Sequence, residues 1–511
     1  MNFMNAVRQT LNNEYNVSIT ENGAVGYRTT GKELLDLNFA VASLRKMSDA
    51  EVAKRFMKAF CEDHVLAMKW LFYARDVRGG LGERRLFRVV LAELVKSNPE
   101  MVIPVMNLIP EYGRYDDLWC LLDDKEAVNV IYQIVDNQLK SDWENMTAKK
   151  PISILAKWMP SINASSAKTK EYGKKLCKAL KMTEREYRKA LSKLRNYLDV
   201  VEVKMSDKNW SEIKYEAVPS RANLIYNSAF LRNDEARRRE YLGQLEKGAT
   251  KINASTLFPH EIVHKYMSYG WGRNVKAKDA TIEALWKALP DTVKGCGNTI
   301  VVADGSGSMT CTVDHKSGVT ALTVANALAI YFAERSSGDF KDKYITFSNR
   351  PQLVDFSKCK NLHDKLQTAL MHNEVADTNI EKVFDLILTT AINGHMHQED
   401  LPQNILIISD MEFNGCARCN SGRPNQTLFN SIAQKYARAG YKMPRLVFWN
   451  VNSRTGTIPV KENELGVALV SGFSVNVAKM VMSGKTDPFE CLLETLNSER
   501  YAPVEEALLN Q

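Results

Sequence analysis

The ten residues TIVVADGSGS, which run from Thr299 to Ser308, decide the fold class of the second part of the chain. The first five are apolar or β-branched and predict a short buried strand, which ends at Asp304 and a Gly-Ser turn. A long apolar helix is expected behind this turn, from Val319 to Arg335. Strands that are apolar throughout and alternate with helices indicate a parallel sheet covered on both faces. We therefore predict an α/β doubly wound domain, with further strands at 344–347, 405–408, 446–451 and 467–470 and further helices at 362–371, 380–392 and 427–439.

The first part of the chain has a different pattern. Between residues 37 and 290 apolar residues recur at a spacing close to 3.6, which predicts helices. Ser48 and Thr183 each precede a glutamate by three residues, the signature of a capping box at a helix start. Glycines and prolines divide the region into segments of roughly 12 to 18 residues. Short helices joined by short turns favour stacked helix pairs of the HEAT or armadillo kind over a single bundle. The first residues look like an irregular or hairpin-forming arm.

Length and composition bound the architecture. The chain has 511 residues, of which 45% are apolar and 25% are charged, as in ordinary globular proteins. We expect an N-terminal arm at 1–36, an α-helical HEAT-like domain at 37–294 and an α/β domain at 295–511. No apolar stretch approaches the ~20 residues of a membrane span, so we expect no membrane contact. Nine cysteines, an odd number, are typical of reduced thiols in a cytoplasmic protein.

The positive charge of the chain lies in its first part. The whole chain carries a formal charge of +8. Residues 1–300 contain 48 Lys and Arg against 37 Asp and Glu, whereas residues 301–511 contain 20 against 23. A basic part beside a near-neutral part favours a polyanion as the partner of the first, most often a nucleic acid.

Polar side chains gather where the predicted strands of the second part end. Ligands of doubly wound sheets bind outside the carboxyl ends of the strands, so we expect side chains at these positions to meet. Hydroxyls and carboxylates are hard oxygen ligands of the kind that Mg²⁺ prefers, and the sequence offers no imidazole or thiolate among them. The sequence therefore predicts a divalent metal site with Mg²⁺ as the preferred ion, whose candidate ligands are Asp304, Ser306, Ser308, Thr378 and Asp410.

This pattern, Asp-x-Ser-x-Ser with a later Thr and Asp on separate loops, resembles the metal-ion-dependent adhesion site of von Willebrand factor A domains. The resemblance implies a Rossmann-like domain that holds a divalent ion and accepts a carboxylate from an acidic protein ligand. The alternative is a tight Gly-Ser turn after a strand, with no ion. Glu412 follows Asp410 by two residues. It either contacts the metal ligands without binding the ion itself, or it is a solvated loop carboxylate.

A second resemblance covers most of the chain. The segments YARDVRGGLGERR (73–85) and GRYDDL (113–118), followed by a type A domain, resemble the TROVE module of Ro ribonucleoproteins, and the DUF2828 relatives of that family are the most similar. Supporting segments are WSEI (210–213), VPS (218–220), KINA (251–254) and FPHEI (258–262). The resemblance implies a closed, monomeric ring of helical repeats, completed by the type A domain, that binds structured or misfolded noncoding RNA. An open horseshoe of the same repeats is the alternative. Residues 165–250 depart from better-studied Ro proteins.

Two basic surfaces are candidates for RNA binding. From Lys168 to Arg195 there are eleven Lys and Arg against three Glu, and the leucines between them predict a buried face opposite a basic outer wall. A solvated amphipathic hairpin without a partner is the alternative. The candidate RNA contacts on this hairpin are Lys170, Lys174, Lys175, Lys178, Lys181, Arg185, Arg188 and Lys189.

The second basic surface surrounds a glycine-rich loop at 79–82. Such a connector lets backbone N–H groups and arginine forks approach phosphate closely. The loop lacks the Lys-Ser/Thr ending of a nucleotide P-loop, so ATP binding is not expected. The candidate RNA contacts here are Arg75, Arg78, Arg84, Arg85 and Arg114; the alternative is that these arginines pair with Asp76, Glu83 and Asp116.

Other chemistry-bearing residues lead to weaker hypotheses. Cys416 and Cys419 form a lone C-x-x-C, which needs two more ligands, such as His395 and His397, to hold zinc; free thiols are the preferred reading. His260 precedes an apolar segment, where a capping or core role is expected.

The sequence thus predicts a noncatalytic RNA-binding protein of the Ro type with a divalent metal site. The alternative function is a metal-dependent protein-interaction or scaffold module in a larger assembly, without RNA. A hydrolase is not expected, because two carboxylates at one ion without a His or Lys base leave water activation poorly served.

Overall fold

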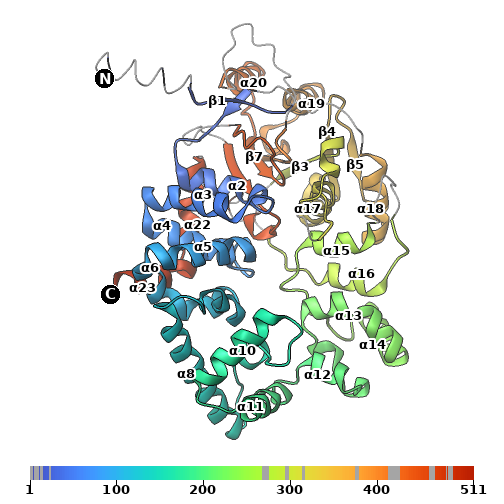
Figure 1. Cartoon of the computed structure of the whole chain (residues 1–511). Helices are drawn as coiled ribbons and strands as arrows, with labels where there is room; N and C mark the ends of the chain where they lie inside the picture. Colours follow the sequence, from blue (N-terminus) through green and yellow to red (C-terminus); the bar gives the residue numbers. More distant parts are fainter. Residues whose placement is uncertain are drawn as a thin grey trace. The chain divides into compact units, whose positions relative to one another are not determined.

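The apolar strands of the second part form a six-stranded sheet in the computed structural model, with the order β5-β4-β3-β6-β7-β8 (Figure 1). Neighbours pair in parallel except β5, which is antiparallel to β4. Consecutive residues of β3 and β6 are all buried, and because neighbouring side chains point to opposite faces, both faces are covered. The strands are β3 Thr299–Asp304, β4 Lys343–Phe347, β5 Leu353–Asp355, β6 Asn404–Ser409, β7 Arg445–Asn450 and β8 Val467–Ser471.

The structure describes residues 15–21, 25–267, 275–293, 298–313, 317–373, 379–412, 426–459, 467–478 and 487–510, together with residues 4, 11 and 480. Contacts divide the chain into two compact units. The α/β unit comprises residues 1–64 and 254–498, and the helical unit comprises residues 65–253 and 499–511. These units cut the chain at other places than the domain boundaries expected from the sequence at 36 and 295, which stay a prediction.

The strand order changes direction at the centre of the sheet, between β3 and β6. From β3 the chain passes through helix α17 (Ala321–Arg335) to β4 on one side and later returns to β6 on the other side of β3. Helix α17 packs along β3, β4 and β6, and its Phe332 ring meets Trp449 of β7 edge to face at 5.6 Å. The carboxyl ends of β3 and β6 therefore flank the point where ligands bind in open α/β sheets.

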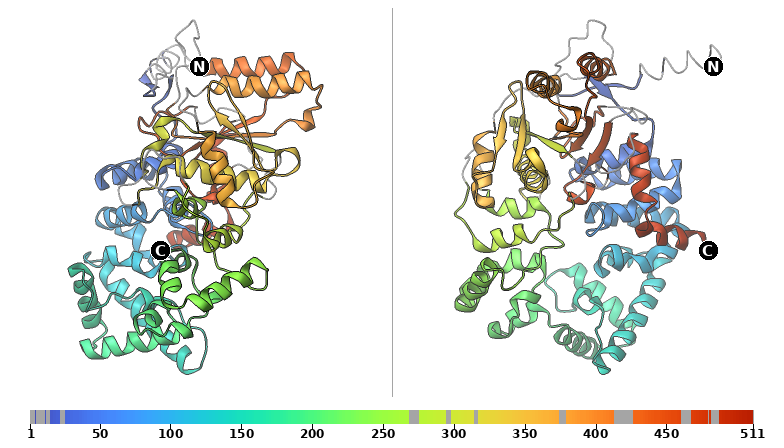
Figure 2. Two further views of the ribbon diagram at one scale, coloured as in Figure 1. Left: turned by 90° about the vertical axis from the view of Figure 1, so that its right-hand side faces the viewer. Right: turned by 180° about the vertical axis from the view of Figure 1, so that it is seen from behind.

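Helices α19 (Ile380–Asn393) and α20 (Gln426–Arg438) lie side by side on the α/β unit (Figure 2), and the rings of Phe384 and Tyr436 are 6.1 Å apart. The predicted helix at 362–371 is α18 (Leu362–Met371). These elements confirm the α/β class. The sequence did not predict the antiparallel edge strand β5, which has only three residues.

The N-terminal segment packs on the α/β unit. Strands β1 (Val17–Ile19) and β2 (Val25–Tyr27) form the hairpin that the sequence allowed. The backbones of Tyr27 and Ile458 exchange two hydrogen bonds of 2.8 Å. Behind the hairpin, α2 (Glu33–Leu44) contacts β8, and its neighbour is α3 (Asp49–Glu62). The unit is completed by α15 (Pro259–Tyr266), α16 (Ala280–Lys287) and α22 (Pro488–Leu496).

The helical unit is built from short helices, as predicted. The capping box at Thr183 is present with both of its reciprocal hydrogen bonds, and the Ser48 side chain of the other unit accepts from Glu51 N–H. Stacked HEAT repeats stay a prediction. The helices of this unit are α4 His64–Arg75, α5 Arg84–Ser97, α6 Pro99–Val102, α7 Ile109–Tyr112, α8 Ala127–Thr147, α9 Leu155–Trp158, α10 Ala167–Ala179, α11 Glu184–Tyr197, α12 Val201–Ser206, α13 Ser220–Asn233, α14 Glu235–Glu246 and α23 Ala502–Leu509.

Among the described residues, no helix combines the length and apolar character that crossing a membrane requires.

Candidate metal centre and nucleic-acid surface

Two carboxylates meet at the carboxyl ends of neighbouring strands. In the parallel pair β3–β6, Ala303 lies opposite Ile408, so Asp304 and Asp410 follow at the same edge of the sheet. Both side chains are buried, with exposed fractions of 2% and 1%. The sequence placed both residues at this edge, and the structure brings them together.

The Gly-Ser turn after β3 adds two hydroxyls to these carboxylates. Ser306 N–H donates to Asp304 Oδ1 at 2.9 Å, and the hydroxyls of Ser306 and Ser308 are 3.0 Å apart. Ser409, the last residue of β6, donates its hydroxyl to Asp304 Oδ2 at 2.6 Å. Four of the five predicted metal ligands therefore belong to one cluster; the fifth, Thr378, lies outside the described residues.

The electrostatics of this cluster favour a cation. Burial raises the pKa of Asp304, and burial together with the Asp304 carboxylate raises the pKa of Asp410 to about 6. Asp410 Oδ2 is buried and accepts no hydrogen bond from the described residues. Two crowded carboxylates, one unsatisfied carboxylate oxygen and two hydroxyls are a donor set that fits a hard divalent ion such as Mg²⁺.

A cationic side chain that the sequence analysis did not single out also faces this cluster. Ser409 of β6 pairs with Asn450 of β7, and the loop after β7 carries Arg454 to the same edge. The guanidinium Nη1 of Arg454 lies 3.4 Å from Asp410 Oδ2, and its Nη2 forms an ion pair with Glu21. The sequence signal was a charged residue just past a strand's carboxyl end.

Glu412 has a structural role in this region. It is 2% exposed, so the alternative of a solvated loop carboxylate is wrong. Its carboxylate accepts hydrogen bonds from three backbone N–H groups, those of Glu21 at 2.9 Å, Arg454 at 2.8 Å and Thr455 at 2.9 Å. Glu412 therefore joins the N-terminal segment to the loop that carries Arg454.

The predicted basic hairpin exists as helices α10 and α11 of the helical unit. Leu176, Leu191 and Leu194 form its buried face, as expected. Most of its cations are exposed. The exposed ones without an ion pair to a described residue are Lys170, Lys178, Lys181, Arg185, Arg188, Lys189 and Lys193, the last of which lies over the ring of Trp143.

Two lysines of the hairpin that the sequence predicted as RNA contacts, Lys174 and Lys175, lie close to carboxylates of the protein. Lys175 is half-buried and pairs with Asp123, as does Lys168, and the two lysines lower the pKa of Asp123 to about 2. Lys174 Nζ lies 4.0 Å from Glu184. The positive charge of the outer face therefore comes mainly from the cations of the hairpin other than these paired lysines.

Beside α11 the helical unit has a pocket of about 160 Å³. Its lining combines the aromatic ring of Tyr187 with the guanidinium of Arg188 and aliphatic groups of Ile162 and Leu191. The second guanidinium, of Arg195, donates to the backbone oxygens of Ala156 and Met159.

The arginines around the glycine-rich loop are largely paired. Arg75 is 5% exposed and binds the buried carboxylate of Asp117 at 2.8 Å, which corrects its assignment to an RNA-facing surface. Arg84 and Arg114 both pair with Asp116. The exposed members are Arg78, which donates to the backbone oxygen of Glu111, Arg85, and Arg84, whose side chain stays 43% exposed although it is paired.

The structure bears only in part on the zinc hypothesis and on the role expected for His260. Cys416 and Cys419 lie outside the described residues, whereas His395 and His397 are exposed. In the part of the chain that the structure describes, no group of three or more His, Cys, Asp or Glu is placed to hold a metal ion; the cluster at Asp304 combines two carboxylates with hydroxyls. His260 is buried, with its ring 5.2 Å from Phe473, which agrees with a core role.

Comparison with known proteins divides the chain into two matched regions. Residues 298–504 match the family model "Domain of unknown function (DUF7788)". A curated relative is similar along nearly the whole chain: "Uncharacterized protein L728" of Acanthamoeba polyphaga mimivirus is 29% identical over 535 residues, which cover 96% of this chain and 89% of the relative. Neither description names a ligand or an activity.

The first region matches the family model "Domain of unknown function (DUF2828)" over residues 20–111 and 122–299. These segments make up more than half of the chain and include α2, the helical unit up to residue 253 except residues 112–121, and the helices before β3. The chain belongs to the DUF2828 family.

Proposed function

We propose that the protein is a noncatalytic, cytoplasmic RNA-binding protein of the Ro type. In this proposal the helical unit is a TROVE-like ring of HEAT-like repeats that binds structured or misfolded noncoding RNA. The α/β unit is a von Willebrand factor A-like domain that holds a divalent ion. The observation that carries the proposal is the set of exposed cations on α10 and α11 that have no carboxylate partner among the described residues.

The charge pattern of α10 and α11 supports a phosphate-binding role. Lys178, Arg185 and Lys189 are exposed, and none has an ion pair with the described residues. Cations that are not neutralised by the protein release counterions from an RNA backbone when they bind it, which makes the affinity depend strongly on salt. The pocket beside α11, with Tyr187 and Arg188 in its lining, offers a place for an unstacked base.

The cluster at Asp304 supports a structural ion in this proposal. Asp304, Ser306, Ser308 and Asp410 would hold the ion, and a bound ion supplies a coordination position that accepts a carboxylate. Ser409 fixes Asp304 by its hydrogen bond of 2.6 Å.

The test is RNA affinity in a charge-reversed hairpin. The variant Lys178→Glu, Arg185→Glu, Lys189→Glu is expected to bind labelled bulk tRNA at least tenfold more weakly than the wild type, with a shallower salt dependence. The matched control is Lys125→Glu, Lys247→Glu, Lys251→Glu, which makes the same charge change at exposed residues of the helical unit. Equal loss in both variants, or no loss in the first, contradicts a hairpin surface for RNA.

A second candidate function follows from Asp410 Oδ2, which accepts no hydrogen bond from the described residues although Arg454 lies 3.4 Å away. A metal-dependent protein-interaction or scaffold module would use the ion to bind an acidic protein ligand, and RNA would be absent. Under this alternative the freshly purified protein shows the ultraviolet absorbance ratio of protein alone, before and after a high-salt wash. Under RNA binding the salt wash lowers the ratio of absorbance at 260 nm to that at 280 nm.

A further inference from the structure

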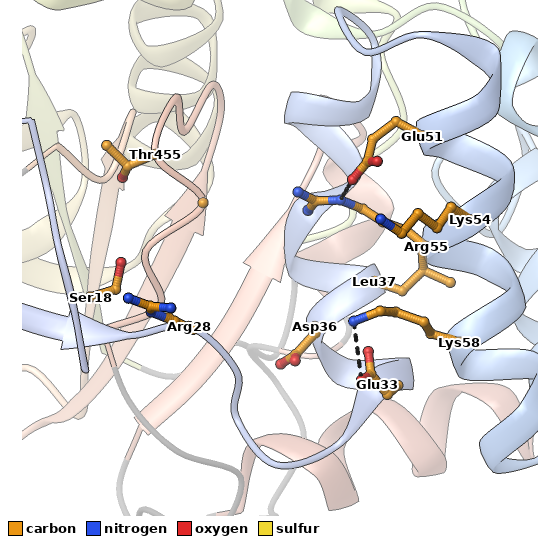
Figure 3. Close-up of a pocket in the computed structure, with 11 residues that line it drawn as sticks. Ser18, Arg28, Glu33, Asp36, Leu37, Glu51, Lys54, Arg55, Lys58 and Thr455 are labelled. Carbon is orange, nitrogen blue, oxygen red and sulfur yellow. Dashed lines mark hydrogen bonds and ion pairs between the residues drawn. The ribbon is translucent and has the colours of Figure 1, made fainter. Parts of the chain in front are cut away.

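The α/β unit has a polar pocket between its N-terminal hairpin and helices α2 and α3 (Figure 3). Its volume is about 250 Å³. Ser18 and Arg28 of the hairpin and Thr455 and Gly456 of the loop after β7 form one wall. The other wall consists of side chains of the two helices, namely Glu33, Asp36, Leu37, Glu51, Lys54, Arg55 and Lys58.

A smaller cavity of about 40 Å³ continues this pocket inward. The two share Arg28, Asp36, Arg55 and Gly456 in their linings, and the inner cavity reaches Asn450, the last residue of β7. The pocket therefore opens from the carboxyl end of a parallel strand, the edge at which doubly wound sheets bind ligands.

The three carboxylates of the pocket are already engaged. Glu51 accepts from Arg55 Nε at 3.0 Å, and Glu33 accepts from Lys58 Nζ at 3.5 Å. Asp36 Oδ1 accepts two hydrogen bonds from Thr30, from its N–H at 2.7 Å and from its hydroxyl at 2.6 Å. Arg55 and Lys58 thus offset the charges of Glu51 and Glu33, whereas Asp36 is bound by neutral donors, and burial raises its pKa.

Two cations of the pocket retain unused hydrogen-bonding capacity. Arg28 uses Nε to bind the backbone oxygen of Val17 at 3.1 Å, which holds the guanidinium in place while its terminal nitrogens have no partner among the described residues. Lys54 is exposed and forms no ion pair with them. In Figure 3, Arg28 and Lys54 come from opposite walls of the pocket.

We propose that this pocket binds the phosphate group of a small phosphorylated molecule. The planar fork of Arg28 matches two phosphate oxygens, and Lys54 adds a second positive charge from the facing wall. The hydroxyl of Ser18 also lies in the lining, 3.0 Å from the hydroxyl of Thr457. The volume admits a small molecule but no folded nucleic acid, so this site is separate from the RNA surface of the helical unit.

The pocket also borders the metal centre through one loop. Thr455 lines the pocket, and its N–H and hydroxyl both bind Glu412, two residues after Asp410. The preceding residue, Arg454, faces Asp410. A bound phosphate would thus contact the same loop that carries the guanidinium of the metal centre.

The experiment is calorimetric titration of the full chain with inorganic phosphate, ribose 5-phosphate and, as the carboxylate probe, acetate. We expect saturable binding of both phosphates and at least tenfold weaker binding of acetate. The variant Arg28→Met, Lys54→Met is expected to lose at least tenfold in phosphate affinity. The control variant Lys358→Met, Arg438→Met removes two exposed cations elsewhere in the α/β unit and should bind as the wild type does.

Circular dichroism melts of both variants show whether the fold is retained. Because the side chains of Arg28 and Lys54 form one hydrogen bond with the described residues, that of Arg28 Nε to Val17, both variants are expected to melt with the wild type. Absent binding of either phosphate, equal affinity for acetate, or wild-type affinity in Arg28→Met, Lys54→Met would overturn the proposal. None of these outcomes bears on RNA binding by α10 and α11. If the phosphate proposal is contradicted, the proposed function can still be tested separately.

Discussion

The guanidinium of Arg500 binds the buried carboxylate of Asp76 through two nitrogens, across 424 positions of the sequence. Asp76 is fully buried and also accepts from the hydroxyl of Tyr501 at 3.1 Å. The last residues of the described chain therefore supply the counter-ion of a carboxylate in the YARD segment of the helical unit.

Removing this counter-ion should destabilise the helical unit. Arg500→Met is expected to lower its free energy of unfolding by about 3 kcal/mol, because a buried carboxylate loses its partner. Hydrogen exchange followed by mass spectrometry resolves the two units and would show faster exchange at residues 65–253. Lys96→Met is the control, since Lys96 forms only an exposed ion pair with Glu93, and a change below about 0.5 kcal/mol is expected. Equal effects of both substitutions would contradict this role of Arg500.

Magnesium ions should stabilise the α/β unit. At a concentration of 100 times Kd, a ligand that binds only the folded state adds about 2.7 kcal/mol, which would appear as a rise in Tm. Ser306→Ala and Ser308→Ala are each expected to reduce this rise, because each removes a hydroxyl ligand. Asp339→Asn, an exposed carboxylate of the same unit, should leave it unchanged. A rise in Tm that persists in both serine variants would place the ion elsewhere.

The raised pKa of Asp410 makes a prediction about pH in the presence of a chelator. The folded-state pKa is about 6, whereas the unfolded value is near 4, so the folded state binds more protons between these values. Stability should therefore fall as the pH rises from about 4 to about 6. Asp410→Asn should remove much of this fall and increase the free energy of unfolding at pH 7 by about 2 kcal/mol. Urea unfolding at several pH values measures both, and a less stable Asp410→Asn at pH 7 would contradict the expectation.

Loss of the Glu412 carboxylate should detach the N-terminal segment. Glu412→Ala leaves three half-buried backbone N–H groups without their carboxylate acceptor, at a cost of about 2 kcal/mol. Limited trypsin digestion should then cut at Arg28 faster than in the wild type. Glu399→Ala, which changes an exposed glutamate of the same unit, is expected to leave the cleavage rate as it was.

The sequence predicted the central elements of the α/β unit well. Strand β6 has four apolar residues in a row, and all six of its residues are buried. Such an unbroken apolar run is easy to recognise, and it arises because both faces of a parallel sheet are covered. The edge strand β5 was missed because three residues, two of them exposed, leave no such pattern. The grouping of α2 and α15 with the sheet was missed as well, since helical periodicity shows that a face is buried but not against which element.

The sequence predicted those residues of the candidate site that come directly after a strand. Asp304 and Asp410 were placed because adjacent parallel strands bring their carboxyl ends together. Arg454 was not, because its position depends on the course of a loop. The pairing of Arg75 with Asp117 is likewise a tertiary contact, 42 positions apart, that local charge patterns do not contain.

The division of the chain into units has a consequence for biosynthesis. Residues 65–253 interrupt the α/β unit, and residues 499–511 return to the helical unit after the sheet is complete. A chain emerging from the ribosome must hold α2 and α3 without their sheet until β7 and β8 are made, and the partner of Asp76 arrives later still. Folding of either unit is thus tied to synthesis of the other, and a chain severed near residue 295 would leave two fragments that each expose part of a core.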